Sequence, residues 1–126
     1  MRYLLDTTLL VDHAKGRPGV GRLVEALFDE PNDLYTCDVI VVESLSGWDP
    51  DERAVIRSLV RVLEYVAASP ETAEWAAESR NAGRAGEPRS LADAVIAAVA
   101  WSLDATIITR NPRDFESQGV RVLAYV

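Results

Sequence analysis

Short aliphatic runs alternate along this chain with longer segments in which apolar residues recur every three or four positions. The short runs predict buried strands, and the longer segments predict helices with one buried face. The clearest helical period lies in residues 51–66, whose expected inward stripe is Ile56, Leu59, Val60 and Leu63. Strands are expected at 2–6, 33–37, 106–109 and 121–126, helices at 7–16, 18–31, 39–47, 51–66, 71–83 and 90–103, and a short helical turn within 110–115.

The alternation of strands and helices predicts an α/β fold with a short, mainly parallel central sheet. Several of the strands are aliphatic throughout, as parallel strands are when helices cover both faces of their sheet. A length of 126 residues suits one compact domain, and no linker or internal repeat interrupts it. We therefore expect a single three-layer α/β/α domain over residues 1–126.

Composition narrows the chemistry. The only cysteine, Cys37, and the only histidine, His13, exclude an intrachain disulfide, a cysteine–histidine zinc cluster and a well-placed Ser-His-Asp triad. The net charge of −7 argues against binding nucleic acid by bulk electrostatic attraction. No apolar run reaches the length of about 18 residues that a membrane span needs, and the first residues do not form a signal peptide, so a cytoplasmic location is expected.

Three carboxylates interrupt aliphatic runs: Asp6 in YLLDTTLLVD, Glu43 in VIVVESL and Asp93 in SLADAVIAAVA. A carboxylate in apolar surroundings is costly unless it finds a hydrogen bond, a counter-charge or a metal ion. Asp6 follows a strand directly, and the other two belong to helices expected beside the same carboxyl edge of the sheet, where sites of parallel sheets form. If the fold gathers them, a divalent cation offsets their repulsion.

Oxygen ligands without histidine or cysteine favour hard cations such as Mg²⁺ or Mn²⁺. A metal-polarised water can attack a phosphorus atom, so hydrolysis of phosphodiesters is the reaction that this set of residues favours. Each acid also has a simpler explanation. Asp6 could cap a helix, Asp93 could complete a capping box with Ser90, and Glu43 could pair with an arginine.

The successive motifs YLLDTTLLVD, VVESLSG, LADAVIAAVA and IITRNPRDF, between residues 3 and 115, resemble those of PIN-domain ribonucleases, in particular the toxins of VapBC toxin–antitoxin pairs. The resemblance implies a Rossmann-like fold with four or five parallel strands. It also implies an endoribonuclease dependent on magnesium or manganese, usually a homodimer, that acts on RNA such as tRNA. A VapB-like antitoxin would inhibit it.

The resemblance assigns the metal site to Asp6, Glu43 and Asp93. Asp6 and Asp93 match the direct ligands, and Glu43 would ligate a second metal ion or deprotonate the attacking water. Thr7 and Thr109 are expected to orient these groups by hydrogen bonds.

The fourth acidic position of the family departs from its usual pattern. Many relatives carry an acid directly after the Thr-Arg pair, where this chain has Asn111, and Asp114 is the nearby acid. The fourth group is therefore either Asn111 or Asp114. The departure keeps open an alternative function, a catalytically weakened PIN-like module that binds RNA or protein. A haloacid-dehalogenase-like phosphatase is disfavoured, because Thr8 stands where its second aspartate belongs.

An acidic site that cuts RNA needs nearby cations for the phosphates. Arginine suits bidentate contacts with phosphate, and twelve of the thirteen basic residues are arginines. The candidates nearest the expected site are Arg84, Arg89, Arg110 and Arg113.

Overall fold

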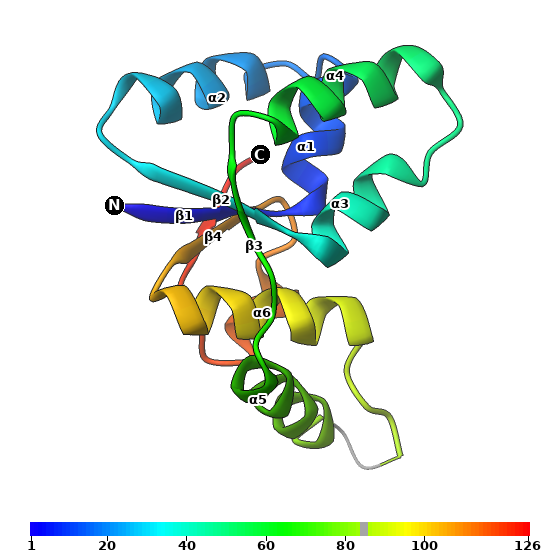
Figure 1. The fold of residues 1–126 in the computed structure, drawn as a ribbon, viewed down its shortest axis with the longest axis vertical. Helices are drawn as coiled ribbons and strands as arrows, with labels where there is room; N and C mark the ends of the chain where they lie inside the picture. Colours follow the sequence, from blue (N-terminus) through cyan, green and yellow to red (C-terminus); the bar gives the residue numbers. More distant parts are fainter. Residues whose placement is uncertain (84–85) are drawn as a thin grey trace.

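The computed structural model describes residues 1–83 and 86–126, and within these ranges five strands form one parallel sheet. The order across the sheet is β3-β2-β1-β4-β5, and each neighbouring pair is parallel (Figure 1). The strands are β1 Arg2–Leu5, β2 Asp33–Cys37, β3 Glu64–Val66, β4 Thr106–Thr109 and β5 Val122–Ala124.

Helices cover both faces of this sheet, which confirms the expected three-layer α/β/α architecture. Helices α1, α2 and α4 lie on one side, and α5 and α6 lie on the other (Figure 1). The helices are α1 Thr7–Ala14, α2 Val20–Asp29, α3 Asp38–Leu45, α4 Pro50–Val60, α5 Pro70–Asn81, α6 Leu91–Leu103 and α7 Arg113–Glu116. None of the helices in the described ranges has the length and apolar character needed to cross a bilayer.

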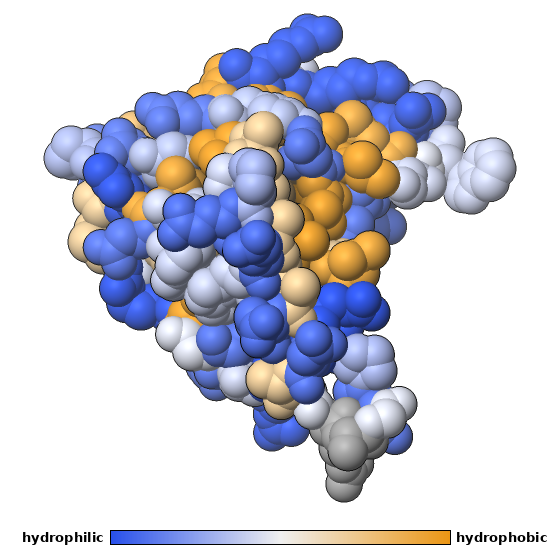
Figure 2. All heavy atoms as spheres, turned by 60° about the horizontal axis from the view of Figure 1, so that its bottom comes forward, coloured by the Kyte–Doolittle hydropathy of each residue, from blue (hydrophilic) through white to orange (hydrophobic). Residues whose placement is uncertain are grey.

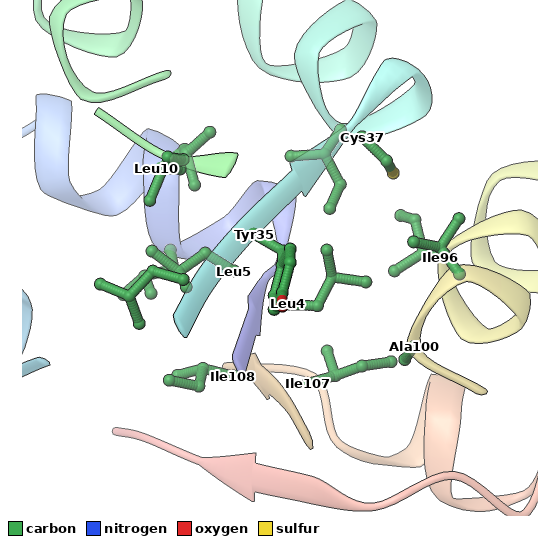
Figure 3. Close-up of a cluster of buried hydrophobic side chains, with 14 of the residues drawn as sticks. Leu4, Leu5, Leu10, Tyr35, Cys37, Ile96, Ala100, Ile107 and Ile108 are labelled. Carbon is green, nitrogen blue, oxygen red and sulfur yellow. The ribbon is translucent and has the colours of Figure 1, made fainter. Parts of the chain in front are cut away.

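The core lies on both sides of the two central strands, β1 and β4. Leu4 and Ile107 point toward α6, whereas Leu5 and Ile108 point toward the face covered by α1 (Figure 3). All four side chains are fully buried. Alternate residues of a strand face opposite sides of the sheet, so two covered faces require an unbroken aliphatic run. This requirement explains why these strands are recognisable in the sequence.

The expectation of one helix over residues 51–66 is wrong. Helix α4 ends at Val60, and Glu64–Val66 form β3, which pairs in parallel with β2. Leu63 is buried at the end of the connection, so it satisfies the helical pattern without being helical. Tyr65 and Val66 favour extended backbone, and their strand supplies partners for the outer edge of β2.

Smaller differences concern the ends of elements. Helix α3 begins at Asp38, one residue before the expected start at residue 39, because Cys37 occupies the capping position with extended backbone. Helix α2 starts at Val20 because Gly19 adopts a left-handed conformation with φ of 85°. The last strand covers only Val122–Ala124 of the expected 121–126.

The parallel arrangement brings distant segments to one edge of the sheet. Because the strands run in the same direction, the segments that follow β1, β2 and β4 all begin at the carboxyl edge. These segments are α1, α3 and the loop of residues 110–112, and α3 also packs against α6. Every sequence motif with a candidate acid therefore reaches this edge.

We expect the buried central strand to be far more sensitive to shortening than the edge strand. Ile107→Val, at a fully buried side chain, should lower the free energy of unfolding by about 1 kcal/mol. Leu123→Val, at a side chain that is 43% exposed, should lower it by less than about 0.5 kcal/mol. Urea unfolding of both variants measures the difference. Equal losses would show that β5 is packed as tightly as β4.

Candidate active site

Asp6 stands at the junction of β1 and α1. Its backbone N–H donates to the carbonyl of Ile108 at 3.1 Å, and its own carbonyl accepts from the amides of Leu9 and Leu10. Asp6 thus occupies the capping position of α1, but its carboxylate makes no capping hydrogen bond. Helix capping therefore explains the backbone of this residue and not its side chain.

The Asp6 carboxylate is held by hydroxyl groups instead. Its Oδ2 accepts from Thr109 Oγ1 at 2.7 Å and from Thr8 Oγ1 at 3.3 Å, and the residue is only 5% exposed. Burial raises its pKa above the usual range. Hydrogen bonds from Thr109, Thr7 and Thr8 lower the pKa in part, and the charge of Glu43 raises it further. The hydroxyls orient the carboxylate without neutralising it.

Glu43 approaches the same edge from α3. Its Oε1 accepts from the hydroxyl of Thr7 at 2.8 Å, which ties the start of α1 to α3. The side chain is otherwise exposed. Among residues 1–83 and 86–126, no arginine pairs with it, so the structure does not support an arginine partner for Glu43.

Asp93 lies in the first turn of α6, where its backbone N–H donates to Ser90 Oγ at 3.3 Å. Ser90 therefore caps the helix, and the Asp93 carboxylate remains available. Its pKa rises to about 6, first through partial burial and then through the charges of Asp114, Asp6 and Glu43. These three charges come from three other segments, which agrees with the placement of all four carboxylates at one edge of the sheet.

Asn111 and Asp114 lie in the loop and short helix after β4. The backbone N–H of Asn111 donates to Thr109 Oγ1 at 3.0 Å, and the backbone N–H of Asp114 donates to the backbone carbonyl of Asn111 at 3.4 Å. Both side chains are exposed. Of the two, only Asp114 carries a charge, and this charge raises the pKa of Asp93.

Gln118 joins the segments that carry Asp93 and Asp114, and no pattern in the sequence points to it. Its Nε2 donates to the Asp114 carbonyl at 2.8 Å and to the Asp93 carbonyl at 3.4 Å, while its Oε1 accepts from the Ser79 hydroxyl at 2.6 Å. The residue is 9% exposed. A lone glutamine after a short helical turn has no distinctive pattern, so only the packing of α6 against α5 and α7 shows its place.

Two of the four arginine candidates lie away from the carboxylates or outside the described ranges. The guanidinium of Arg89 donates to the carbonyls of Ser79 at 2.6 Å and Ser117 at 2.9 Å, so it fastens the segment before α6 to neighbouring backbone. Arg84 lies outside the residues that the structure describes.

The other two arginine candidates, Arg110 and Arg113, border the carboxylates. Arg110 binds the carboxylate of Asp12 through two nitrogens, at 2.9 and 3.4 Å. Arg113 is exposed and, among the described residues, has no hydrogen-bond or ion-pair partner. Arg113 is therefore the candidate whose charge is free to meet a phosphate.

Two open hollows border the carboxylates. One, of about 430 Å³, is formed by residues 110–114. The other, of about 290 Å³, lies between α3 and α6 and is lined by Asp38, Val39, Val42, Glu43, Leu91 and Ala92. Apolar surface also gathers in a recess of the molecule in the space-filling view (Figure 2). A ligand at the carboxylates would thus meet a polar loop on one side and aliphatic side chains on the other.

The donors at this edge are all oxygens, which suits Mg²⁺ or Mn²⁺. Among the described residues, no three histidine, cysteine, aspartate or glutamate side chains converge closely enough to enclose a metal ion by themselves. Mg²⁺ keeps several waters and needs only one or two carboxylates, so this spacing fits a hydrated ion. Burial, and then the charges of Asp114, Asp6 and Glu43, raise the pKa of Asp93, and a bound cation would offset both effects.

The chain is similar in sequence and in fold to several known proteins. The chain is 26% identical over 114 residues to Ribonuclease VapC19 of Mycobacterium tuberculosis, across 89% of this chain and 90% of that protein. Its fold matches VapBC2 from Rickettsia felis bound to a promoter DNA fragment, with a TM-score of 0.82, 20% identity and full coverage of both chains. It also matches FitAcB from Neisseria gonorrhoeae, with a TM-score of 0.78, 22% identity and 96% coverage of each chain.

The family relationship rests on nearly the whole chain. The model of the PIN domain family matches residues 3–119, a range that contains all four carboxylates and every motif from which the resemblance was drawn. The resemblance is therefore confirmed at the level of the family. This chain belongs to the PIN domain family.

Proposed function

We propose that this chain is a metal-dependent endoribonuclease, the toxin of a toxin–antitoxin pair, built as a single PIN domain over residues 1–126. The observation that carries the proposal is the placement of four carboxylates from four segments at one edge of the sheet, near enough for Asp114, Asp6 and Glu43 to contribute to the raised pKa of Asp93. The similarity to a protein named Ribonuclease VapC19 supports RNA as the substrate. A tRNA is our candidate for that RNA.

In this proposal, Asp6 and Asp93 ligate Mg²⁺ or Mn²⁺, some contacts passing through water. When bound, the ion polarises the attacking water and offsets charge on the leaving oxygen. Glu43, whose Oε1 is fixed by Thr7, accepts the proton of the attacking water with its free oxygen or helps to hold a second ion. The Thr109 hydroxyl keeps the Asp6 carboxylate oriented.

Asp114 is proposed as the fourth acidic group, because its charge reaches Asp93. Asn111 lies beside it and can orient a water molecule without adding charge. Arg113, free of partners among the described residues, would hold a phosphate of the RNA next to the cleaved bond. The acidic set thus acts on the reacting phosphate while a nearby cation retains the chain.

A VapB-like antitoxin is the proposed partner, together with a second copy of this chain in a homodimer. Structures with this fold include toxin–antitoxin complexes, among them one from Klebsiella pneumoniae that is 25% identical, with a TM-score of 0.73, across 90% of this chain and 89% of that chain. The apolar hollow beside Glu43 offers a surface for an antitoxin segment. We place the protein in the cytoplasm, where RNA and antitoxin are both present.

The carboxylates should make the metal-free protein less stable as the pH rises. The pKa of Asp93 in the folded state is about 6, above its ordinary value of 3.8. The folded state therefore binds this proton more tightly than the unfolded chain, and stability falls between about pH 4 and about pH 6. Thermal unfolding in EDTA should show this loss, and Asp93→Asn should raise the melting temperature at neutral pH.

Adding Mg²⁺ or Mn²⁺ at neutral pH should raise the melting temperature of the wild type more than that of Asp93→Asn, because the ion binds only the folded site. Asp29→Asn, at an exposed carboxylate at the end of α2, is the matched control and should behave as wild type. A folded protein whose stability ignores both metals would instead support the catalytically weakened binding module.

Cleavage should depend on the same carboxylates. With Mg²⁺ or Mn²⁺, purified protein should cut labelled tRNA, and Asp6→Asn and Asp93→Asn should each lower the rate by about a hundredfold or more. The rate of product formation on a denaturing gel measures this loss, with Asp29→Asn again as control. Equal cleavage by wild type and both variants would mean that a contaminating nuclease is responsible.

A titration can distinguish whether Asp114 or Asn111 is the fourth group of the site. Asp114→Asn should lower the pKa of Asp93 from its value of about 6, because one of its repelling charges is gone. Asn111→Ala should leave that pKa unchanged, since it removes no charge. Carbon-13 NMR titration of the Asp93 carboxyl measures both. An Asp93 pKa that stays at about 6 in Asp114→Asn would show that Asp114 is not the fourth acidic group.

A further inference from the structure

We propose that Asp12 is a positioning residue of this site, which acts by holding Arg110 and, through it, the loop of residues 110–114. The inference rests on the proposed ribonuclease function for its catalytic consequence. It also changes the expectation for Arg110, which the sequence suggested as a contact for RNA.

Asp12 is a carboxylate inside the protein that the carboxylate cluster does not use. It lies on α1, six residues after Asp6, and is only 5% exposed. Its Oδ2 accepts from Arg110 Nε at 2.9 Å and from the Tyr125 hydroxyl at 2.7 Å, and its Oδ1 accepts from Arg110 Nη2 at 3.4 Å. Arg17 Nε adds a longer ion-pair contact at 4.0 Å. A carboxylate this buried depends on such partners.

Arg110 is bound to α1 at its backbone as well as at its side chain. Its backbone N–H donates to Thr8 Oγ1 at 3.2 Å, and the same hydroxyl donates to the Asp6 carboxylate. The hydroxyl of the preceding residue, Thr109, donates to the Asp6 carboxylate and accepts from the backbone N–H of Asn111. The peptide that leaves β4 is thus fixed at two places along α1, near Asp6 and near Asp12.

The loop that this arrangement fixes carries the remaining charged groups of the site. Asn111, Arg113 and Asp114 follow Arg110 directly, and Asp114 is one of the charges that Asp93 senses. Without the Asp12–Arg110 contact, the start of the loop would be held only by the bonds through Thr8 and Thr109, while its far end keeps the bond from Gln118 to the Asp114 carbonyl. A misplacement of about 1 Å at reacting groups can cost about a hundredfold in rate, so this second anchor matters for catalysis.

The same contact removes Arg110 from the set of free cations. Its two nitrogens face a carboxylate inside the protein, so binding a phosphate would require leaving Asp12 without its main partner. Arg113 has no such carboxylate partner among the described residues. The two arginines of this loop therefore have different tasks, one holding the loop and one facing the substrate.

The test compares Asp12→Asn, Arg110→Gln and the double variant, in which an amide pair can keep a hydrogen bond without burying a lone charge. Each single variant should lower kcat about ten- to a hundredfold with KM changed less than about threefold, as misplaced groups require. The kcat of the double variant should be no lower than that of the less active single variant, because all three variants remove the same Asp12–Arg110 contact.

Asp104→Asn is the matched control. Asp104 also pairs with an arginine, Arg121, at 2.7 Å, but this pair is exposed and does not involve the loop. Its loss should leave kcat and KM unchanged. Melting temperatures of all variants confirm that they fold.

Phosphate binding by Arg110 would give the opposite pattern. Arg110→Gln would then raise KM, leave kcat unchanged and reduce the salt dependence of kcat/KM by about 0.7 in log–log slope, the value for one phosphate contact on single strands. Asp12→Asn would lower KM, because it frees the guanidinium. Either result overturns the proposal.

Amide hydrogen exchange decides the positioning claim without RNA or metal. Asp12→Asn and Arg110→Gln should increase exchange at the backbone amides of Arg110, Asn111, Arg113 and Asp114 and leave α6 protected, whereas Asp104→Asn should leave that loop as in the wild type. Unchanged exchange overturns the proposal, as does a loosened loop with unchanged kcat. If the wild type shows no Asp6-dependent cleavage, the ribonuclease function fails, and exchange still decides whether Asp12 holds the loop.

Discussion

Repulsion among like charges is the constraint around which this structure is organised. Four carboxylates, from the β1–α1 junction, α3, α6 and the segment after β4, lie at one sheet edge, and burial together with the charges of the other three raises the pKa of Asp93 to about 6. Hydroxyl groups, amides and backbone hydrogen bonds hold these groups in place without neutralising their charge. Such an arrangement destabilises the folded state of the metal-free protein, and a bound cation offsets the repulsion.

The parts of the fold that the sequence revealed are those with a pattern of their own. β1 and β4 are covered on both faces and must be aliphatic throughout, and α6 has a serine cap followed by a long apolar run. β3 was missed because Leu63 is buried and fits the period of the helix before it. Only pairing with β2, which is a contact between distant residues, distinguishes a strand there.

The candidate site shows the same division. Asp6, Glu43 and Asp93 could be singled out because an acid in an aliphatic run is conspicuous. Gln118 and Asp12 could not, because their importance comes from partners that are distant in the chain, such as Ser79 and Tyr125. Arg110 was recognised as close to the site, but a sequence cannot show that its charge is already engaged.

The topology also sets when this site can come into existence. Asp6 is made among the first residues, yet its backbone bonds Ile108 and its carboxylate bonds Thr109. β1 must wait for β4 to be inserted beside it, so during synthesis the early part of the chain carries Asp6 and Glu43 without the other two carboxylates. A ribosome making this protein would therefore have translated most of the chain before the proposed active site could form.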